Sequence, residues 1–159
     1  MAELYIGIEL GDEFSTVAWL DRDSSKIHIV KENEKDRIPS MISLNTATGC
    51  WCAGEAARNE QGVNGRIVLH RLVGLLRSGK RLEVGGTEYT APRMMSYYLE
   101  YLIELTKKST GIEKIAAVAI CMDFPSLKES EQLYRIMKNI GVENDQIHIL
   151  NRQEAMVYF

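Results

Sequence analysis

The chain has 159 residues, of which 45% are hydrophobic and 26% are charged, and its formal net charge is −3. This length provides one ordinary domain with a core of its own, and the mildly acidic balance argues against a nucleic-acid partner. No apolar run approaches the roughly 20 residues that span a bilayer, and the N-terminus lacks the basic and apolar regions of a signal peptide. An odd number of cysteines, three, argues against a disulfide framework, so we expect a cytoplasmic protein with no membrane partner.

The first part of the chain predicts a three-stranded antiparallel meander. Its strands are expected at the apolar runs 4–10, 14–20 and 26–31. The first run carries a single acid, Glu9, and a tight turn follows at residues 11–13. Because the backbone N–H groups of such a turn can hold a phosphate, this turn is a candidate anion site beside a carboxylate.

The middle of the chain predicts short elements and one long helix. The short elements are strands near residues 41–45 and 50–53, a helix at 54–58, and a hairpin at 81–89. The long helix is expected at 91–109, with Thr90 as its cap and Pro92 in its first turn. Its apolar stripe, which we expect to be buried, comprises Met94, Met95, Tyr98, Leu99, Leu102, Ile103 and Leu105.

The last third predicts a strand–helix–strand–helix order with a parallel pair of strands. The run 115–120 is apolar throughout, as in a strand covered on both faces. Ser126 and Glu129 form a capping box that opens a helix ending at Gly141, and a strand at 146–150 leads to a last helix. Since that last helix stops on an apolar run after about two turns, we expect the chain to be part of a longer protein.

Residues 5–20 resemble the first phosphate loop of the actin-like ATPases, and most closely that of the DnaK-type heat-shock chaperones. The family sequence is apolar-Gly-Ile-Asp-Leu-Gly-Thr-Thr-x-Ser; here Glu9 stands for the Asp, and Asp12 and Glu13 replace the two threonines. The matching positions are Gly7, Gly11 and Ser15. Further segments resemble DnaK-type motifs in the same order, at residues 30–40, 53–57, 70–74, 89–92, 118–124 and 151–155.

This resemblance implies a ribonuclease-H-like (actin-like ATPase) α/β fold, in which a β-meander and a strand–helix–strand–helix unit share one mixed sheet. The chain would be the first lobe of a two-lobed nucleotide-binding domain. Residues 1–38 and 115–159 would form its base subdomain, and residues 39–114 would form an inserted upper subdomain. The second phosphate loop and the adenine pocket of such proteins would lie outside this chain.

The resemblance also implies a ligand site at the first turn. Glu9 would help to hold a hydrated Mg²⁺ ion. The residues that would contact the phosphates of ATP or ADP are Gly11, Asp12, Glu13 and Phe14.

The catalytic positions implied by the resemblance, Glu9, His70 and Arg152, are all altered in this chain. His70 stands where the family has a lysine near the γ-phosphate, and Arg152 stands where it has a glutamate that helps to organise the metal and its water. Glu9 keeps the acid but is one methylene longer. The two carboxylates added at the turn would each repel a triphosphate by about 1 to 4 kcal/mol at roughly 4 Å. The resemblance therefore predicts a retained fold with weak or absent hydrolysis.

Each of these residues also has a structural interpretation. Glu9 could be a strand-end acid inherited with the fold, and His70 could be a surface histidine on a helix. Asp12 and Glu13 could form an exposed acidic turn or hold a cation. Arg152 could pair with Glu9 across the site.

Cys50 and Cys52 lie on one expected strand, so both thiols could face one metal ion. A structural zinc site usually has four ligands, and the sequence offers no second cysteine pair. Ordinary buried thiols are therefore the preferred interpretation.

The sequence leaves three functions open. The first is a DnaK-like ATP-binding module with weak or absent hydrolysis, which acts in nucleotide-gated or protein-mediated interactions. The second is an active phosphoryl-transfer ATPase or kinase with rewired residues, and the third is a scaffold or filament-forming protein without nucleotide. We also expect the isolated chain to associate with itself, through apolar surface at Ile147, Ile149, Met156, Val157 and Phe159.

Overall fold

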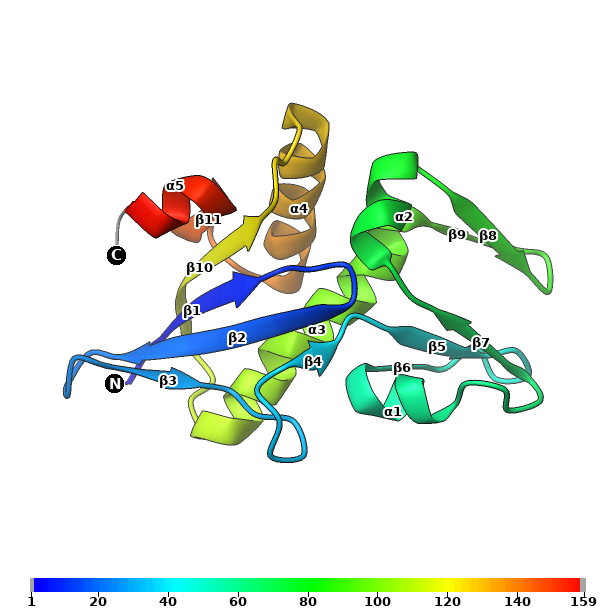
Figure 1. Cartoon of the computed structure of the whole chain (residues 1–159), viewed down its shortest axis with the longest axis horizontal. Helices are drawn as coiled ribbons and strands as arrows, with labels where there is room; N and C mark the ends of the chain where they lie inside the picture. The colour runs from blue at the N-terminus through cyan, green and yellow to red at the C-terminus, as the bar shows by residue number, and fades with distance from the viewer. Residues whose placement is uncertain (1, 158–159) are drawn as a thin grey trace.

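The computed structural model describes residues 2–157, with side chains up to residue 155, and shows a mixed α/β fold with a mixed sheet (Figure 1). The strands are β1 (Leu4–Glu9), β2 (Phe14–Asp21), β3 (Lys26–Ile29), β4 (Ile38–Pro39), β5 (Ile42–Asn45), β6 (Trp51–Ala53), β7 (Arg66–Leu69), β8 (Arg81–Val84), β9 (Thr87–Thr90), β10 (Ile115–Met122) and β11 (Ile147–Asn151). The helices are α1 (Gly54–Asn59), α2 (Leu72–Ser78), α3 (Ala91–Thr110), α4 (Leu127–Ile140) and α5 (Arg152–Val157), with a 3₁₀ turn, η1 (Asn144–Gln146). Within this range no helix combines the length and apolar character that crossing a membrane requires.

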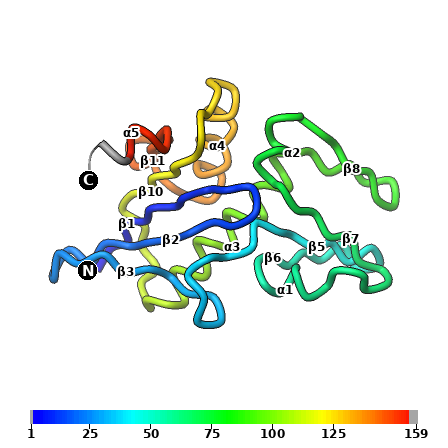
Figure 2. Tube along the Cα trace, in the orientation of Figure 1, coloured from blue at the N-terminus to red at the C-terminus, as the bar shows by residue number. Residues whose placement is uncertain are grey.

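The strands form three sheets. The largest has six strands, with β11-β10-β1-β2-β3 as consecutive neighbours and β4 paired to β2; β6-β5-β7 form a second sheet, and β8-β9 form a hairpin. The chain trace places both termini beside the large sheet, with the second sheet and the hairpin at the other side of the molecule (Figure 2).

The pairing within the large sheet is antiparallel at one side and parallel at the other. β2 runs antiparallel to both β1 and β3, which confirms the predicted meander. β10 runs parallel to β11, as predicted, and also to β1. Glu9 lies opposite Cys121, and Met122 lies opposite Asn151, so the carboxyl ends of β1, β10 and β11 meet at one edge of the sheet.

One face of the large sheet carries the core. Alternate residues of β10 are buried among side chains of α3 and α4, and the residues between them are only half-buried. Figure 1 shows both helices behind the same face. The prediction that residues 115–120 are covered on both faces is therefore wrong for the described residues. The sequence was misleading because alanines, which are apolar, occupy the half-open face of the strand as well as its core side.

Helix α3 contributes more buried residues to this core than any other described element. The Thr90 hydroxyl accepts a hydrogen bond from Arg93 N at 3.4 Å, Pro92 lies in the first turn, and Gly111 ends the helix in the left-handed region. The predicted stripe is buried except for Leu105, which is half-buried because it lines a surface groove beside Tyr101.

Elements β4, β7 and η1 were not predicted, and α2 was implied only by the interpretation of His70 as a helical residue. β4 and η1 are too short to leave a periodic pattern, and β7 is an edge strand whose four residues are all half-buried. Because β7 occupies residues 66–69 and α2 begins at Leu72, His70 lies in the connecting loop. The prediction that His70 lies on a helix is therefore wrong, although its exposure is confirmed.

The apolar surface also differs from the prediction. Ile147 is buried against the core and Ile149 is half-buried, since α4 packs over β11, while the side chains of residues 156 and 157 and the whole of residue 159 lie outside the described part. The large apolar side chains that are exposed are Ile27, Ile29, Val63, Phe124 and Leu127.

The capping box of α4 also ties this helix to α2. Ser126 Oγ accepts from Glu129 N, and the Glu129 carboxylate accepts from Ser126 N at 2.7 Å, as predicted. The same carboxylate accepts a hydrogen bond from Arg77 Nε at 2.7 Å, and Arg77 also donates to the Asp123 carbonyl. Burial opposes the charged form of Glu129, but the hydrogen bonds from Ser126 and Arg77 outweigh it and lower the pKa of the carboxyl.

The position of Leu102 in the core can be tested by truncation. Leu102 is fully buried, so Leu102→Ala should lower the free energy of unfolding by about 2 to 5 kcal/mol. Leu127→Ala is the matched control, because Leu127 is 78% exposed and its truncation should change that free energy by less than about 0.5 kcal/mol. Chemical denaturation measures both, and equal losses would contradict the described core.

Glu129 predicts a pH dependence of stability. Because its pKa is lowered in the folded state, its contribution is complete above the unfolded value of about 4.3 and is lost as the pH falls through the folded pKa. Glu129→Gln should therefore cost about 1 to 3 kcal/mol at neutral pH and much less under strongly acidic conditions. Glu131→Gln, at an exposed position of the same helix, should show no such trend. A cost of Glu129→Gln that stays constant with pH in urea unfolding would reject the ion-paired capping box.

Candidate functional site

The carboxyl ends of the parallel strands hold a charged cluster. Glu9 is the last residue of β1, Asp123 follows β10, and Arg152 follows β11 as the first residue of α5. Arg152 Nη2 lies 2.6 Å from Glu9 Oε1, and Arg152 Nη1 lies 3.7 Å from Asp123 Oδ2. The pairing of Arg152 with Glu9, one of the two interpretations from the sequence, is thus confirmed.

This cluster is open to solvent. The side chains of Arg152 and Glu9 are 46% and 45% exposed, so the ion pair contributes at most about 1 kcal/mol to stability. The ion pair matters for the chemistry of the site, because Glu9, the acid expected to hold a metal, already binds the Arg152 guanidinium. Cys121, the neighbour of Glu9 in the parallel ladder, has its pKa raised by burial and by the charge of Glu9, so its thiol stays protonated.

The residues present do not fit a magnesium site. Mg²⁺ requires near-octahedral oxygen ligands, whereas Glu9 binds Arg152. A divalent ion about 4 Å from that guanidinium would be repelled by about 2 to 8 kcal/mol for a dielectric constant between about 80 and 20. Among the described residues, no group of three or more His, Cys, Asp or Glu side chains is arranged to hold a metal.

The turn between β1 and β2 is built around Gly11. A Cβ at this position would lie 2.4 Å from the carbonyl oxygen of Phe14, so the turn accepts only glycine without rearrangement. In the described part of the chain, the N–H groups of Asp12 and Glu13 have no hydrogen-bond partner within the protein. They are therefore available to an external acceptor.

Asp12 has a structural partner. Its Oδ1 accepts a hydrogen bond at 2.9 Å from the N–H of Gly74, which lies 62 residues further along the chain in the first turn of α2. The N-cap residue of α2, Arg71, has φ 56° and offers no side-chain cap, so Asp12 satisfies one of the free N–H groups of this helix. Asp12 and Glu13 are both exposed, which confirms the interpretation of an exposed acidic turn, and Asp12 in addition holds α2.

The remaining predicted residues gather at a pocket beside the turn. Asp12, Glu13 and Phe14 line a cavity of ≈ 440 Å³ together with His70 and other residues between positions 39 and 71. The Arg37 guanidinium lies 4.4 Å from the centre of the Phe14 ring and holds it by a cation–π contact. Glu9 and Arg152 do not line this cavity, so the structure places the predicted site residues in two neighbouring groups.

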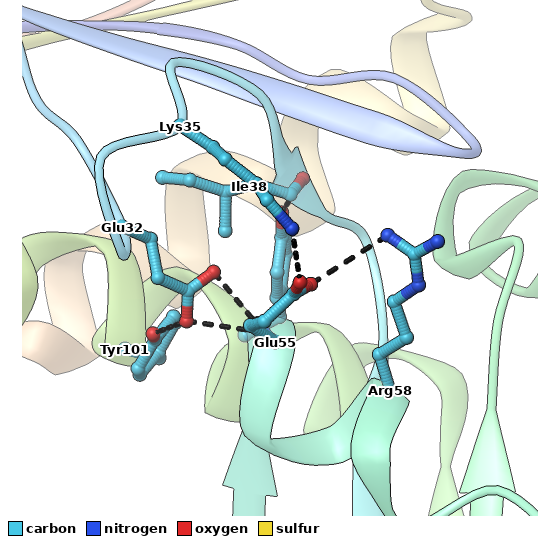
Figure 3. A network of polar contacts seen from close by, with 7 residues as sticks. Glu32, Lys35, Ile38, Glu55, Arg58 and Tyr101 are labelled. Carbon is cyan, nitrogen blue, oxygen red and sulfur yellow. Dashed lines mark hydrogen bonds and ion pairs between the residues drawn. The ribbon is translucent and has the colours of Figure 1, made fainter.

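A second remote carboxylate, from Glu32, caps helix α1 (Figure 3). Both carboxylate oxygens of Glu32 accept from Glu55 N at 3.0 Å, and the Tyr101 hydroxyl donates to the same carboxylate. Burial and this carboxylate raise the pKa of Tyr101, which keeps the hydroxyl protonated as a donor. Gly54 is required here, because its φ is +64° and a Cβ would lie 2.6 Å from Glu32 Oε1.

Glu32 was missed from the sequence, because its partners are distant along the chain and its local pattern is that of a polar connection. The neighbouring ion pair of Lys35 and Glu55, which lie 2.6 Å apart in the structure, also joins residues that are distant along the chain (Figure 3). Neither residue carries a sequence motif.

The cysteine pair does not form a metal site. Cys50 is exposed, whereas Cys52 is half-buried and donates to Glu60 Oε2 at 3.3 Å. Burial and the Glu60 carboxylate raise the pKa of Cys52 to about 11, so its free side chain is a thiol near neutral pH.

Comparison with known proteins gives the family. A family model described as "Family of unknown function (DUF5716) C-terminal" matches residues 23–159, which is most of the chain. The chain belongs to the DUF5716 C-terminal family. The matched part of this DUF5716 domain includes His70 and Arg152, whereas Glu9 and the turn at residues 11–13 precede it.

The DUF5716 domain is also similar to DnaK chaperones. It is 24% identical over 119 residues to the "Chaperone protein DnaK" of Thermotoga neapolitana and to that of Thermosipho africanus. Each match covers 75% of this chain but 20% of the relative, so the chain spans about a fifth of the length of the curated relatives it matches.

The role of Asp12 as a cap can be tested by amide exchange. Asp12→Ala should destabilise the first turn of α2 by about 1 kcal/mol and speed exchange at Gly74 N about fivefold. Asp12→Asn keeps an acceptor oxygen and should retain most of the protection. Asp23→Ala, which removes an exposed acid from the next turn, is the charge control. Unchanged exchange at Gly74 in Asp12→Ala would show that the carboxylate does not cap the helix.

Proposed function

We propose that the DUF5716 domain is the first lobe of a DnaK-like nucleotide-binding module, which binds ATP or ADP and hydrolyses ATP weakly or not at all. Its fold would be the ribonuclease-H-like fold of the actin-like ATPases. Residues 1–38 and 115–159 would form the base subdomain, and residues 39–114 would form the inserted subdomain. The protein would be cytoplasmic, and its partners would be proteins.

The observation that carries this proposal is the position of the charged groups relative to the sheet. In open α/β sheets, ligands bind outside the carboxyl ends of the parallel strands. Glu9 and Arg152 meet at that edge, and the turn at residues 11–13, with free N–H groups, continues directly from it. The similarity to DnaK makes a nucleotide the ligand class to test first.

The same groups support weak hydrolysis. The resemblance assigns catalytic roles to Glu9, His70 and Arg152. Glu9 is bound to Arg152, and His70 is an exposed loop residue. This combination argues against the alternative of an active ATPase or kinase, because phosphoryl transfer depends on positioned cations and an oriented water. The module would then act through nucleotide-gated or protein-mediated interactions.

A second candidate is a scaffold that has kept the fold and lost the nucleotide. The specific observation in its favour is that two acids at the candidate site already have internal partners: Asp12 binds Gly74 N, and Glu9 binds Arg152. Such a protein would act through protein contacts alone. Self-association of the isolated chain, with Phe124 and Leu127 among its exposed apolar groups, remains a prediction of this candidate.

Calorimetric titration of ATP with Mg²⁺ into the full-length protein tests the proposal. Wild type should bind weakly, and the variant Asp12→Thr/Glu13→Thr should bind at least about fivefold more tightly, because it removes two charges that repel phosphate by about 1 kcal/mol or more each. Asp23→Thr/Glu83→Thr removes the same charge from exposed positions away from the turn and is the matched control.

The outcomes separate the candidates. Tight wild-type binding that the turn variant weakens would show that the two acids serve the ligand. Absence of binding by wild type and by a folded turn variant would reject the nucleotide module in favour of the scaffold.

A further inference from the structure

We infer that Arg152 takes the place of a divalent cation in this lobe, so that it receives a phosphate-bearing ligand without Mg²⁺. This inference deepens the proposed nucleotide-binding function and rests on it. It starts from the disagreement between the expected metal site and the groups that are present.

The guanidinium of Arg152 lies where a cation would be shared by the ends of three strands. It contacts Glu9 at the end of β1 at 2.6 Å and approaches Asp123 after β10 at 3.7 Å, while Arg152 itself follows β11. One fixed positive group thus bridges acids from two strands and is anchored by the third. A bound divalent ion would have to displace it from Glu9.

Arg152 keeps donors for a ligand. A guanidinium has five N–H donors in a planar fork, which matches the geometry of phosphate oxygens. One close contact, to Glu9, leaves several donors free, and nearly half of the side chain is exposed. The group can therefore bind an anion at the edge of the sheet while it remains held by the acid.

The nearby acids do not supply a replacement metal site. Asp12 is bound to Gly74 N in α2, and Asp123 is 62% exposed and shares Arg152 with Glu9. The charge of Glu9, Asp123 and Arg152 sums to one negative unit, so the cluster has one acid left over rather than the several that a Mg²⁺ ligand set uses.

Mn²⁺, which takes the place of Mg²⁺ at oxygen sites, provides a probe that needs no nucleotide. In amide-resolved NMR of the chain, Mn²⁺ should leave the signals of residues 9, 121 and 123 unbroadened in wild type. Arg152→Gln keeps the side chain polar but removes the charge. In this variant the signals should broaden at Mn²⁺ concentrations at least about tenfold lower than any that affect the wild type. Arg135→Gln removes the same charge from an exposed position of α4 and should behave as wild type.

Two outcomes of the Mn²⁺ titration would overturn the inference. One is selective broadening of residues 9 and 123 in wild type at the concentrations that affect Arg152→Gln. The other is a folded Arg152→Gln protein that gains no Mn²⁺ binding, since Arg152 would then not be what excludes the ion.

A titration of ADP into the full-length protein, with Mg²⁺ or with excess EDTA, tests the ligand side. The affinity should change less than about twofold between the two conditions, and a loss of about tenfold in EDTA would overturn the inference. Absence of ADP binding under both conditions would reject the nucleotide function, while the Mn²⁺ result would still decide whether Arg152 replaces the cation.

Discussion

Parallel pairing of β1 with β10, and of β10 with β11, determines where the charged groups of the candidate site lie. In this register Glu9 is opposite Cys121 and Met122 is opposite Asn151, so residues from both ends of the sequence meet at one sheet edge. Because side chains alternate between the two faces of a strand, the position of Glu9 depends on the pairing register of β1. A slip of β1 by one residue would turn Glu9 toward the core and Ile8 toward solvent, so burial of the apolar residues also fixes the position of the acid.

The short helices α1 and α2 depend on residues from the first part of the chain. α1 and α2 have six and seven residues, which is too short for stability in isolation, and neither has a side-chain cap of its own. Glu32 and Asp12, which precede both helices in the chain, provide these caps. Asp12 therefore has two consequences: it holds α2 in place, and it brings a negative charge to the turn where a phosphate would bind.

Much of this could be predicted from local sequence. The meander, the helix that carries Leu102 and the capping box at Ser126 follow from periodicity and capping residues that are close together in the chain. The pairing of Arg152 with Glu9 was one of two interpretations, since two opposite charges at corresponding strand ends allow it without requiring it. The contacts of Asp12 with Gly74 and of Glu32 with Tyr101 could not be predicted, because they join residues 62 and 69 positions apart and leave no local pattern. β7 was missed for a related reason: an edge strand with half-buried residues lacks a clear alternation of apolar and polar positions.

We propose that an ion pair and a helix cap occupy the positions to which the DnaK resemblance assigns phosphoryl-transfer roles, so that the protein hydrolyses ATP weakly or not at all. Steady-state release of phosphate from ATP by the full-length protein, with Glu9→Ala measured in parallel, tests this most directly. We predict that release of phosphate by the wild type is weak or absent and that Glu9→Ala does not reduce it. Sustained release by wild type that Glu9→Ala abolishes would contradict it, because Glu9 would then be a working catalytic acid rather than the partner of Arg152.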